Sequence, residues 1–217
     1  YNFFGGSGID LLTGGVSDDT FDGGGGADTI TGGSGNDIFN VTSGIDLITD
    51  LLTGDVLIVS SGATVNATDI SHLIATSATS NAGVANLTAS SSGSTITVTN
   101  SMSGAYSLVG GSRADILTGS SNNDTLNGNG GPDILDGASG DDTLTGGFDH
   151  DYFKVTSGTD QVTDLSTGDI LVVSSGATVN AGNITHFLAT ADTSNSGVAN
   201  LYAGATGSTI AVTNSTI

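Results

Sequence analysis

The chain has 217 residues, a formal net charge of −20 and no cysteine. All 22 acidic residues are aspartate, and the two basic residues are Arg113 and Lys154. The composition excludes disulfides and thiolate metal sites, and two cations cannot neutralise a nucleic-acid backbone. No apolar run approaches the roughly 18 residues of a membrane span. Because 36% of the residues are apolar and regularly placed, we expect a folded chain whose excess charge is neutralised by a cation.

The first predicted element is a tract of nonapeptides over residues 5–58. It begins GGSGIDLLT, GGVSDDTFD, GGGGADTIT and GGSGNDIFN and continues in phase with less glycine. A second tract, 110–172, runs from GGSRADILT to DLSTGDILV in the same phase. A fixed phase over so many units indicates a repeat architecture.

Two positions of the nonapeptide hold throughout both tracts. The sixth is always aspartate: Asp10, Asp19, Asp28, Asp37, Asp46, Asp55, Asp115, Asp124, Asp133, Asp142, Asp151, Asp160 and Asp169. The eighth is always a large apolar residue: Leu12, Phe21, Ile30, Phe39, Ile48, Leu57, Leu117, Leu126, Leu135, Leu144, Phe153, Val162 and Leu171. The pattern predicts a glycine turn followed by a short strand whose middle side chain points inward.

One turn and one strand make half a coil, so every second nonapeptide should stack turn over turn. Asp10 would then lie over Asp28, and Asp124 over Asp142. Two carboxylates with nearby backbone carbonyls offer an all-oxygen site of the kind that Ca²⁺ prefers, whereas zinc or copper would favour His or Cys. Counting every stacked pair gives at most about nine ions, whose charge nearly cancels that of the chain.

At this point the units resemble the RTX (repeats-in-toxin) nonapeptide GGxGxDxUx. The resemblance implies an all-β fold of parallel β-roll, with Ca²⁺ along both edges. It also implies a bacterial protein exported by type I secretion, unfolded in the calcium-poor cytosol and folded outside the cell. We expect a disordered metal-free state.

The segment after each tract is related to its counterpart, since 41–103 and 155–217 are identical at about two-thirds of positions. We therefore predict two tandem modules, 1–105 and 106–217. Within the segment, 68–76 (TDISHLIAT) predicts a short helix, and 84–89 with 94–100 predict a β-hairpin. We expect each such segment, 59–105 and 173–217, to be a small mostly-β cap on the open end of its roll.

Several residues depart from the repeat. Arg113 and Asp149 replace the fourth glycine; Asp tolerates left-handed geometry better than Arg, so a weak or empty site is expected at Arg113. His150 should face solvent, whereas His72 and His186 are interpreted as packed structural residues. No nucleophile–base pair or Gly-x-Ser-x-Gly elbow stands in a suitable context, so an enzyme is not expected.

The function predicted is a secreted, calcium-binding structural protein that assembles head-to-tail with itself into an extracellular filament or surface layer. One chain's end, 215–217, followed by another's Tyr1 nearly recreates the internal junction at 101–106, and such a contact propagates without closing. The alternatives are a two-module fragment of a long adhesin serving as a calcium-stiffened spacer, or a module that binds a cell-surface glycan through the Thr/Ser-rich faces of 59–105 and 173–217.

Overall fold

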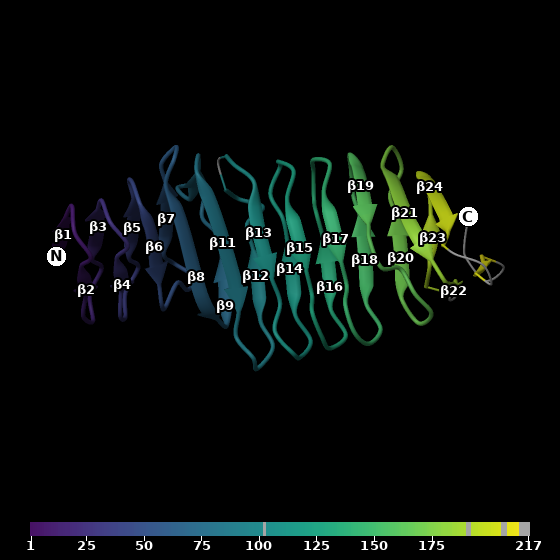
Figure 1. Cartoon of the computed structure of the whole chain (residues 1–217), viewed down its shortest axis with the longest axis horizontal. Coiled ribbons are helices and arrows are strands. Elements are labelled where there is room, and N and C mark those ends of the chain that lie inside the picture. Colours follow the sequence, from purple (N-terminus) through teal and green to yellow (C-terminus); the bar gives the residue numbers. More distant parts are fainter. Residues whose placement is uncertain (102, 190–191, 205–207, 213–217) are drawn as a thin grey trace.

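The computed structural model describes residues 1–101, 103–189, 192–204 and 208–212 as one elongated stack of flattened coils (Figure 1). The N-terminus lies at one end of the long axis and the C-terminal region at the other. The described residues contain 25 strands and no helix. Every strand pairing is parallel, so the chain is an all-β parallel solenoid, as the repeat predicts.

The first tract alternates between two faces of the solenoid. Its strands are β1 (Asn2–Gly6), β2 (Leu11–Thr13), β3 (Thr20–Gly24), β4 (Thr29–Thr31), β5 (Ile38–Val41), β6 (Ile45–Ile48) and β7 (Val56–Val59). The expected register of two nonapeptides is confirmed, since Leu12 pairs with Ile30 and Phe21 pairs with Phe39. Successive units therefore lie on opposite faces, and alternate units stack.

The segment between the tracts continues the solenoid and does not cap it. Its strands are β8 (Thr64–Ile70), β9 (His72–Ile74), β10 (Ser80–Asn81), β11 (Val84–Ala89) and β12 (Thr95–Thr97). The predicted helix over 68–76 is wrong, because this stretch forms the end of β8 and all of β9. The predicted hairpin is also wrong: β11 and β12 belong to different sheets, and each pairs in parallel with the second tract.

The second tract resumes the narrow coils and leads into a repeat of the same wide segment. Its strands are β13 (Tyr106–Val109), β14 (Ile116–Thr118), β15 (Thr125–Asn127), β16 (Ile134–Asp136), β17 (Thr143–Thr145), β18 (Tyr152–Val155), β19 (Thr159–Val162) and β20 (Ile170–Val173). The last strands are β21 (Thr178–Ile184), β22 (His186–Leu188), β23 (Ser194–Asn195), β24 (Val198–Ala203) and β25 (Thr209–Ala211). The division at 105/106 marks the repeat in the sequence. It does not interrupt the sheet, because β11 pairs with β13 across it.

Three long sheets organise these strands. Sheet B contains 11 strands in the order β2-β4-β6-β8-β11-β13-β15-β17-β19-β21-β24 and runs through both tracts. The opposite face is divided between sheet A (β1-β3-β5-β7-β10) and sheet C (β23-β20-β18-β16-β14-β12-β9). Strands β22 and β25 form a separate pair at the C-terminal end.

The apolar core is a single column of side chains between the faces. The eighth-position residues from Phe21 to Leu171 are at most 2% exposed, whereas Leu12 in the first coil is only partly buried. At the N-terminal end the rings of Phe3, Phe21 and Phe39 stack, with centroids 4.9 and 5.4 Å apart. The predicted inward position is thus confirmed along both tracts.

The coils widen between the tracts. Within the tracts, a residue pairs with its equivalent two nonapeptides later along the chain. The offset is longer in the wide coils, where Ala85 pairs with Tyr106 and His72 pairs with Thr95. The corner between β8 and β9 follows Asp69, which has a φ of +60° within β8. Among the described residues, no helix is both long and apolar enough to cross a membrane.

Candidate metal centre

The third and fourth units of the first tract, and the third to fifth of the second, have residues with positive φ at the second and fourth positions of the nonapeptide. Gly33 and Gly35, for example, have φ values of +99° and +138°. The substitutes Asn129 and Asp149 keep the same conformation, with φ values of +67° and +79°. Asn and Asp enter the left-handed region more readily than other side chains, so the expected tolerance at Asp149 is confirmed.

The glycine at the first position is required by lack of space. A Cβ atom added to Gly23 would lie 2.3 Å from Oδ2 of Asp28. One added to Gly128 would lie 2.2 Å from Oδ2 of Asp133 and 2.5 Å from the carbonyl oxygen of Gly146. The turn at Gly128 therefore brings a carboxylate oxygen and a carbonyl oxygen of the neighbouring coil to the same small space, and neither glycine has room for a side chain.

The sixth-position aspartates form two ladders in each tract. In each rung, Oδ1 of one aspartate accepts a hydrogen bond from the backbone N–H of the aspartate two nonapeptides earlier, at 2.9 Å for Asp28 and Asp10. The nine stacked pairs are Asp10/Asp28, Asp19/Asp37, Asp28/Asp46, Asp37/Asp55, Asp115/Asp133, Asp124/Asp142, Asp133/Asp151, Asp142/Asp160 and Asp151/Asp169. The stacking predicted for every pair is therefore confirmed.

The second carboxylate oxygen, Oδ2, has a hydrogen-bond donor in some ladder aspartates and none in others. In six of the eight terminal aspartates Oδ2 accepts a backbone N–H, as from Gly6 to Asp10 at 2.7 Å and from Leu52 to Asp55 at 2.9 Å. In five aspartates Oδ2 is buried and has no hydrogen-bond partner among the described residues: Asp28, Asp133 and Asp142 inside their ladders, and Asp46 and Asp160 at the last position of theirs. A buried carboxylate oxygen without a donor is costly unless a cation meets it.

The raised pKa values of the ladder aspartates also favour a bound cation. Burial, together with the charges of Asp115, Asp149 and Asp151, raises the pKa of Asp133 to about 7. Burial, together with Asp124, Asp136 and Asp160, raises the pKa of Asp142 to about 7 as well. The pKa values of four further rungs rise to about 6 mainly through burial: Asp46, Asp55, Asp151 and Asp160. Without an ion, the fold therefore opposes the charge that these side chains carry at neutral pH.

The donor set fits a hard cation. In the part of the chain that the structure describes, no three His, Cys, Asp or Glu side chains cluster closely enough to hold a metal by themselves. An ion would instead combine carboxylates of stacked aspartates with turn carbonyls, and such an all-oxygen shell suits Ca²⁺. The single lysine does not serve the ladders, because Lys154 Nζ lies 2.5 Å from Oδ2 of Asp136, which is not a ladder residue.

Two residues that matter to the turns escaped the sequence analysis. Asp50 accepts backbone N–H bonds from Gly32 at 2.8 Å and Gly33 at 2.7 Å. Asp164 does the same for Gly146 at 3.0 Å and Gly147 at 2.7 Å. Each stands at the first position of the last unit of its tract, where glycine is expected. The replacement of glycine by aspartate is the feature of the sequence that could have identified them. Each links the last turn of its tract to the turn two nonapeptides earlier, and neither is a ladder residue.

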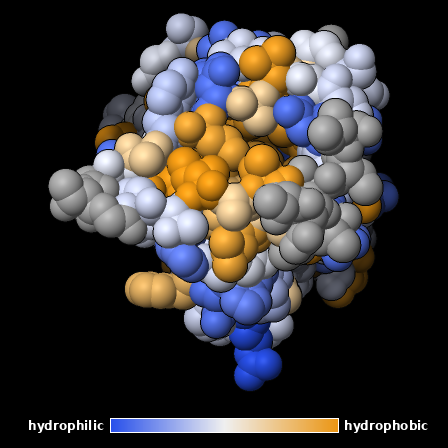
Figure 2. Space-filling view, turned by 90° about the vertical axis from the view of Figure 1, so that its right-hand side faces the viewer, coloured by the Kyte–Doolittle hydropathy of each residue, from blue (hydrophilic) through white to orange (hydrophobic). Residues whose placement is uncertain are grey.

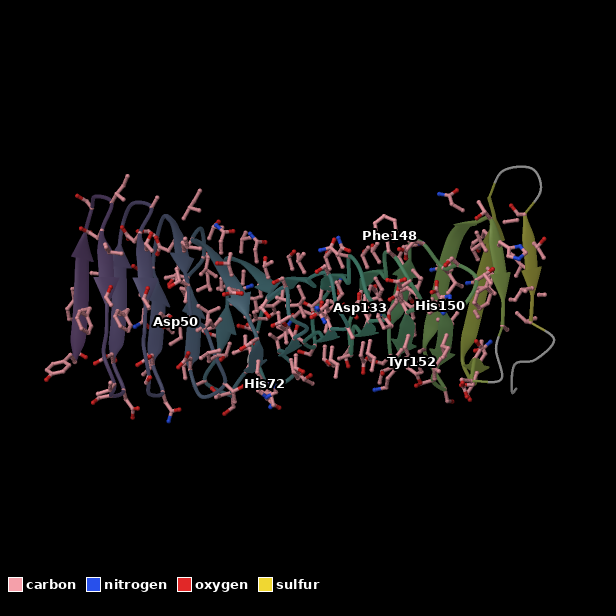
Figure 3. All side chains as sticks on the ribbon, turned by 90° about the horizontal axis from the view of Figure 1, so that it is seen from below. Asp50, His72, Asp133, Phe148, His150 and Tyr152 are labelled. Atoms are coloured by element: carbon pink, nitrogen blue, oxygen red, sulfur yellow. The ribbon has the colours of Figure 1, made fainter. Side chains whose placement is uncertain are left out.

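The burial of the three histidines agrees with the prediction for one of them and differs for the other two. His150 is exposed, as predicted. His72 and His186 are also exposed, so their interpretation as packed residues is wrong; Figure 3 shows His72 at the outside of the molecule. Both follow a corner of the wide coil, and Leu73 or Phe187 takes the inward position instead.

The ladder continues past Arg113, where the sequence predicts a weak or empty site. The next aspartate, Asp115, donates its backbone N–H to Asp133 Oδ1 at 2.8 Å, as in the other rungs. The geometry of the rung is therefore regular, and the weaker binding expected at Arg113 stays a prediction.

Comparison with known proteins supports this geometry. The family model described as the RTX calcium-binding nonapeptide repeat (4 copies) matches residues 4–39, 107–135 and 127–162. These ranges contain ten of the thirteen ladder aspartates, and Asp46, Asp55 and Asp169 lie outside them. No curated protein matches the chain.

Proposed function

This chain is an RTX β-roll protein whose nonapeptide repeats bind Ca²⁺, and from that premise we propose that it is a secreted structural protein that folds on calcium outside the cell. The ions would bind between stacked aspartates of the four ladders, with up to about nine positions. The observation that carries the proposal is the set of five buried Oδ2 atoms in the ladders that have no hydrogen-bond donor among the described residues. The role proposed is structural and not catalytic.

Calcium-dependent folding follows from the charge balance. The ladders bring buried carboxylates within hydrogen-bond reach of one another's backbone, while the core is only one side chain deep on each strand. Such a thin core offsets little chain entropy and self-repulsion. Ligand binding to the folded state alone then drives folding. Export of an unfolded chain from a calcium-poor cytosol is consistent with this coupling.

Calcium titration tests the proposal. The chain is dialysed against a chelator and titrated with Ca²⁺ or, for comparison, Mg²⁺ while circular dichroism and isothermal calorimetry are recorded. We expect β-structure to appear with Ca²⁺ and several ions to bind per chain, with Mg²⁺ much less effective because it demands stricter octahedral geometry. Unchanged cooperative β-structure in excess chelator would refute calcium-dependent folding.

We further propose that the calcium-loaded solenoids assemble head-to-tail into an extracellular filament or surface layer. Support comes from the internal junction, where β11 of the first module pairs in parallel with β13 of the second, so that two modules already stack end to end. Open parallel edges favour pairing with another chain. The sequence argument from 215–217, and from Met102 in the junction, concerns residues outside the described ones.

Electron microscopy of the native material with and without chelator tests the assembly, and calcium-dependent fibres or sheets are the expected result. The adhesin-spacer alternative predicts a native polypeptide much longer than this chain, so the intact mass of the native protein separates the two. Glycan binding stays a prediction.

A further inference from the structure

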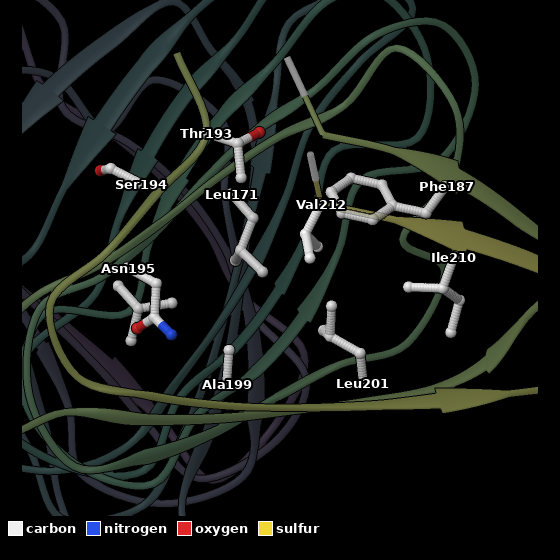
Figure 4. A pocket seen from close by; sticks show the side chains of 10 residues that line it. Leu171, Phe187, Thr193, Ser194, Asn195, Ala199, Leu201, Ile210 and Val212 are labelled. Atoms are coloured by element: carbon white, nitrogen blue, oxygen red, sulfur yellow. The ribbon is translucent and has the colours of Figure 1, made fainter. Parts of the chain in front are cut away.

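The interior of a wide coil is largely apolar, so a site for a polar ligand has to lie at one of its turns. Around the last wide coil, one apolar space is lined among others by Leu171, Phe187, Leu201 and Ile210 (Figure 4). Figure 2 shows this end of the described stack, with hydrophobic residues gathered at its centre. In the first wide coil, by contrast, the turn at residues 89–94 has the sequence ASSSGS, and we call it the serine turn.

The serine turn has the length and the register of a nonapeptide turn. It stacks on the first turn of the second tract, residues 110–115. The strands before the two turns pair Thr88 with Val109, and the strands after them pair Thr95 with Ile116. Six residues therefore connect the strands in both coils, although the serine turn has neither aspartate nor the glycine pattern. The family match of the second tract begins after it, at residue 107.

Ser94 takes the place of a ladder aspartate in the serine turn. Its hydroxyl accepts the backbone N–H of Ser90 at 3.1 Å. In the coil above, Asp115 Oδ2 accepts the N–H of Gly111 in the same way, at 2.6 Å. The Ser94 carbonyl also accepts the N–H of Ile116 at 2.8 Å, a bond that ladder aspartates make with the next coil. The serine turn is therefore built like a ladder turn but lacks the carboxylate.

Asp115 has an unpaired oxygen on the side of the serine turn. The residue is 1% exposed, and its Oδ1 is buried without a hydrogen-bond partner among the described residues. In the stacked pairs, Oδ1 faces the aspartate two nonapeptides earlier, and for Asp115 that place is held by Ser94. Burial raises the pKa of the Asp115 carboxyl, and polar groups of Gly111 and Ser94 are near enough to lower it. A buried carboxylate oxygen in this position is costly unless a cation meets it.

Further oxygens converge beside this carboxylate. The hydroxyl of Ser90 lies 3.1 Å from that of Ser94 and 2.9 Å from that of Ser92. The carbonyl oxygen of Ser90 would lie 2.4 Å from a Cβ atom added to Gly111, so it closely approaches the turn of the next coil. These oxygens belong to hydroxyl and carbonyl groups, which are ligands of hard cations.

The Ser90 carbonyl also lacks a bond that its counterparts make. In several turns of the tracts, the carbonyl of the second position accepts the N–H of the third position of the next stacked turn, as Gly15 does from Ser34 at 2.8 Å. Among the described residues no such bond joins Ser90 to Ser112. The carbonyl is therefore available to an ion, as Asp115 Oδ1 is.

The position can be reached from solvent. A groove of about 460 Å³ is lined among others by Ser92, Ser94 and Asp115. It gives an ion a path to the carboxylate without separation of the coils. Since the chain carries a net charge of −20, the surrounding field attracts cations to such a groove.

We propose that one further Ca²⁺ ion binds between the serine turn and the second tract, held by Asp115 Oδ1, the serine hydroxyls and the Ser90 carbonyl. The inference rests on the calcium binding of the proposed function and adds a position outside the stacked aspartate pairs. This position has one carboxylate where a rung has two, and fewer ligand charges lower the affinity for calcium. It therefore fills after the ladders and fastens the wide coil to the second tract once the tracts have folded.

Substitutions of Ser94 test the site in both directions. Ser94→Ala removes a ligand, and Ser94→Asp supplies the second carboxylate of a rung. Calorimetry and equilibrium dialysis with radioactive Ca²⁺ follow the last ion to bind, and circular dichroism monitors folding. We expect Ser94→Ala to weaken the last binding step at least about tenfold and Ser94→Asp to strengthen it by a similar factor. Ser91→Ala is the matched control, because Ser91 is exposed in the same turn, and it should leave the step unchanged.

Hydrogen exchange locates the last ion. In the unaltered chain, the amides of the serine turn should gain protection only in the calcium range of the last step, after the amides of the two tracts. In Ser94→Ala this late protection should shift to higher calcium, while protection of the tracts stays the same. Protection of the serine turn that rises together with the tracts would contradict a separate, weaker site.

The outcomes separate this inference from the proposed function. A last binding step that is the same in Ser94→Ala, Ser94→Asp and the unaltered chain would overturn the site and leave an ordered water in its place. Folding on calcium would then still stand on the circular dichroism. Should Ser94→Ala fail to fold, Ser94→Asp alone decides, because it keeps an acceptor for the Ser90 N–H. A chain whose β-structure does not respond to calcium at all would instead refute the proposed function.

Discussion

Oδ1 of Asp142 accepts a hydrogen bond from the backbone N–H of Asp124 at 2.7 Å, while Oδ2 of the same carboxylate is buried without a donor. One oxygen therefore holds the coils in register, and the other is left for a cation. The different roles of the two oxygens of one carboxylate link the repeat in the sequence to calcium binding.

Replacing Asp142 by asparagine separates the two roles. In Asp142→Asn the amide oxygen still accepts the Asp124 N–H, but the charge is lost. We expect Ca²⁺ affinity at that edge to fall at least about tenfold, and the metal-free chain to be more folded at neutral pH because a buried charge is removed. Calorimetry and circular dichroism measure both. Asp69→Asn, an exposed change in the wide coil, serves as control and should alter neither; loss of metal-free β-structure in Asp142→Asn would contradict this account.

The pH dependence of the metal-free chain has a definite sign. Aspartates titrate near 3.8 when unperturbed, whereas the pKa of Asp133 in the fold is about 7 and that of Asp46 about 6. Between these values the folded state binds more protons than the unfolded state, so the free energy of unfolding falls as pH rises from about 4 to about 7.

Acidification from about pH 8 to about pH 5 without calcium should therefore increase β-structure, measured by circular dichroism. With calcium present the direction reverses, because protons compete with the ion for the same carboxylates. A metal-free chain that loses β-structure over this pH range would show that the ladder carboxylates are not destabilised by burial.

The first-position glycine can be tested by adding a single methyl group. Gly23→Ala would place a Cβ atom 2.3 Å from Oδ2 of Asp28, whereas a Cβ atom on Gly8 would meet nothing within 4 Å. Neither glycine has a positive φ, so the pair isolates the effect of space. We expect Gly23→Ala to lower calcium affinity at least about tenfold and Gly8→Ala to leave it unchanged. Equal affinities in calcium titrations would argue against an ion at this position.

The core can be compared with the surface within one nonapeptide. Phe153 is 0% exposed, and Phe148 of the same unit is 82% exposed and projects from the surface in Figure 3. In calcium-saturated protein, Phe153→Ala should lower the free energy of unfolding by about 3–5 kcal/mol. Phe148→Ala should change it by less than about 0.5 kcal/mol. Denaturant titration measures both, and similar losses would mean that the core column does not determine stability.

The constant nonapeptide made the tracts predictable. Because Asp10 and Asp28 hold one phase, their stacking and the inward position of Ile30 follow from geometry alone. The wide coils lack that constraint. Ile70 and Leu73 have the spacing of neighbours on one face of a helix, but they point inward from β8 and β9 on either side of the corner at Ser71, which shifts the strand alternation by one residue.

The same reasoning explains the false hairpin. A turn rich in Ser and Gly between two alternating segments is typical of antiparallel strands, but residues 90–94 carry the chain to the opposite face of the solenoid. Which partner a strand finds depends on neighbouring coils that local sequence does not encode. Asp50 and Asp164 were missed for a similar reason, since their partners lie in a turn two nonapeptides earlier.

Sheet B bonds the whole length of one side, whereas among the described strands no pairing joins sheet A to sheet C on the other. A rod built in this way does not flex equally in all directions. Bending that spreads the A–C side breaks no strand ladder there and strains isolated contacts such as the Thr53 N–H to His72 carbonyl bond at 3.1 Å. Bending that spreads the B side must stretch a continuous ladder. The molecule therefore has a compliant direction and a stiff one, with its flexure concentrated between the two calcium-binding tracts.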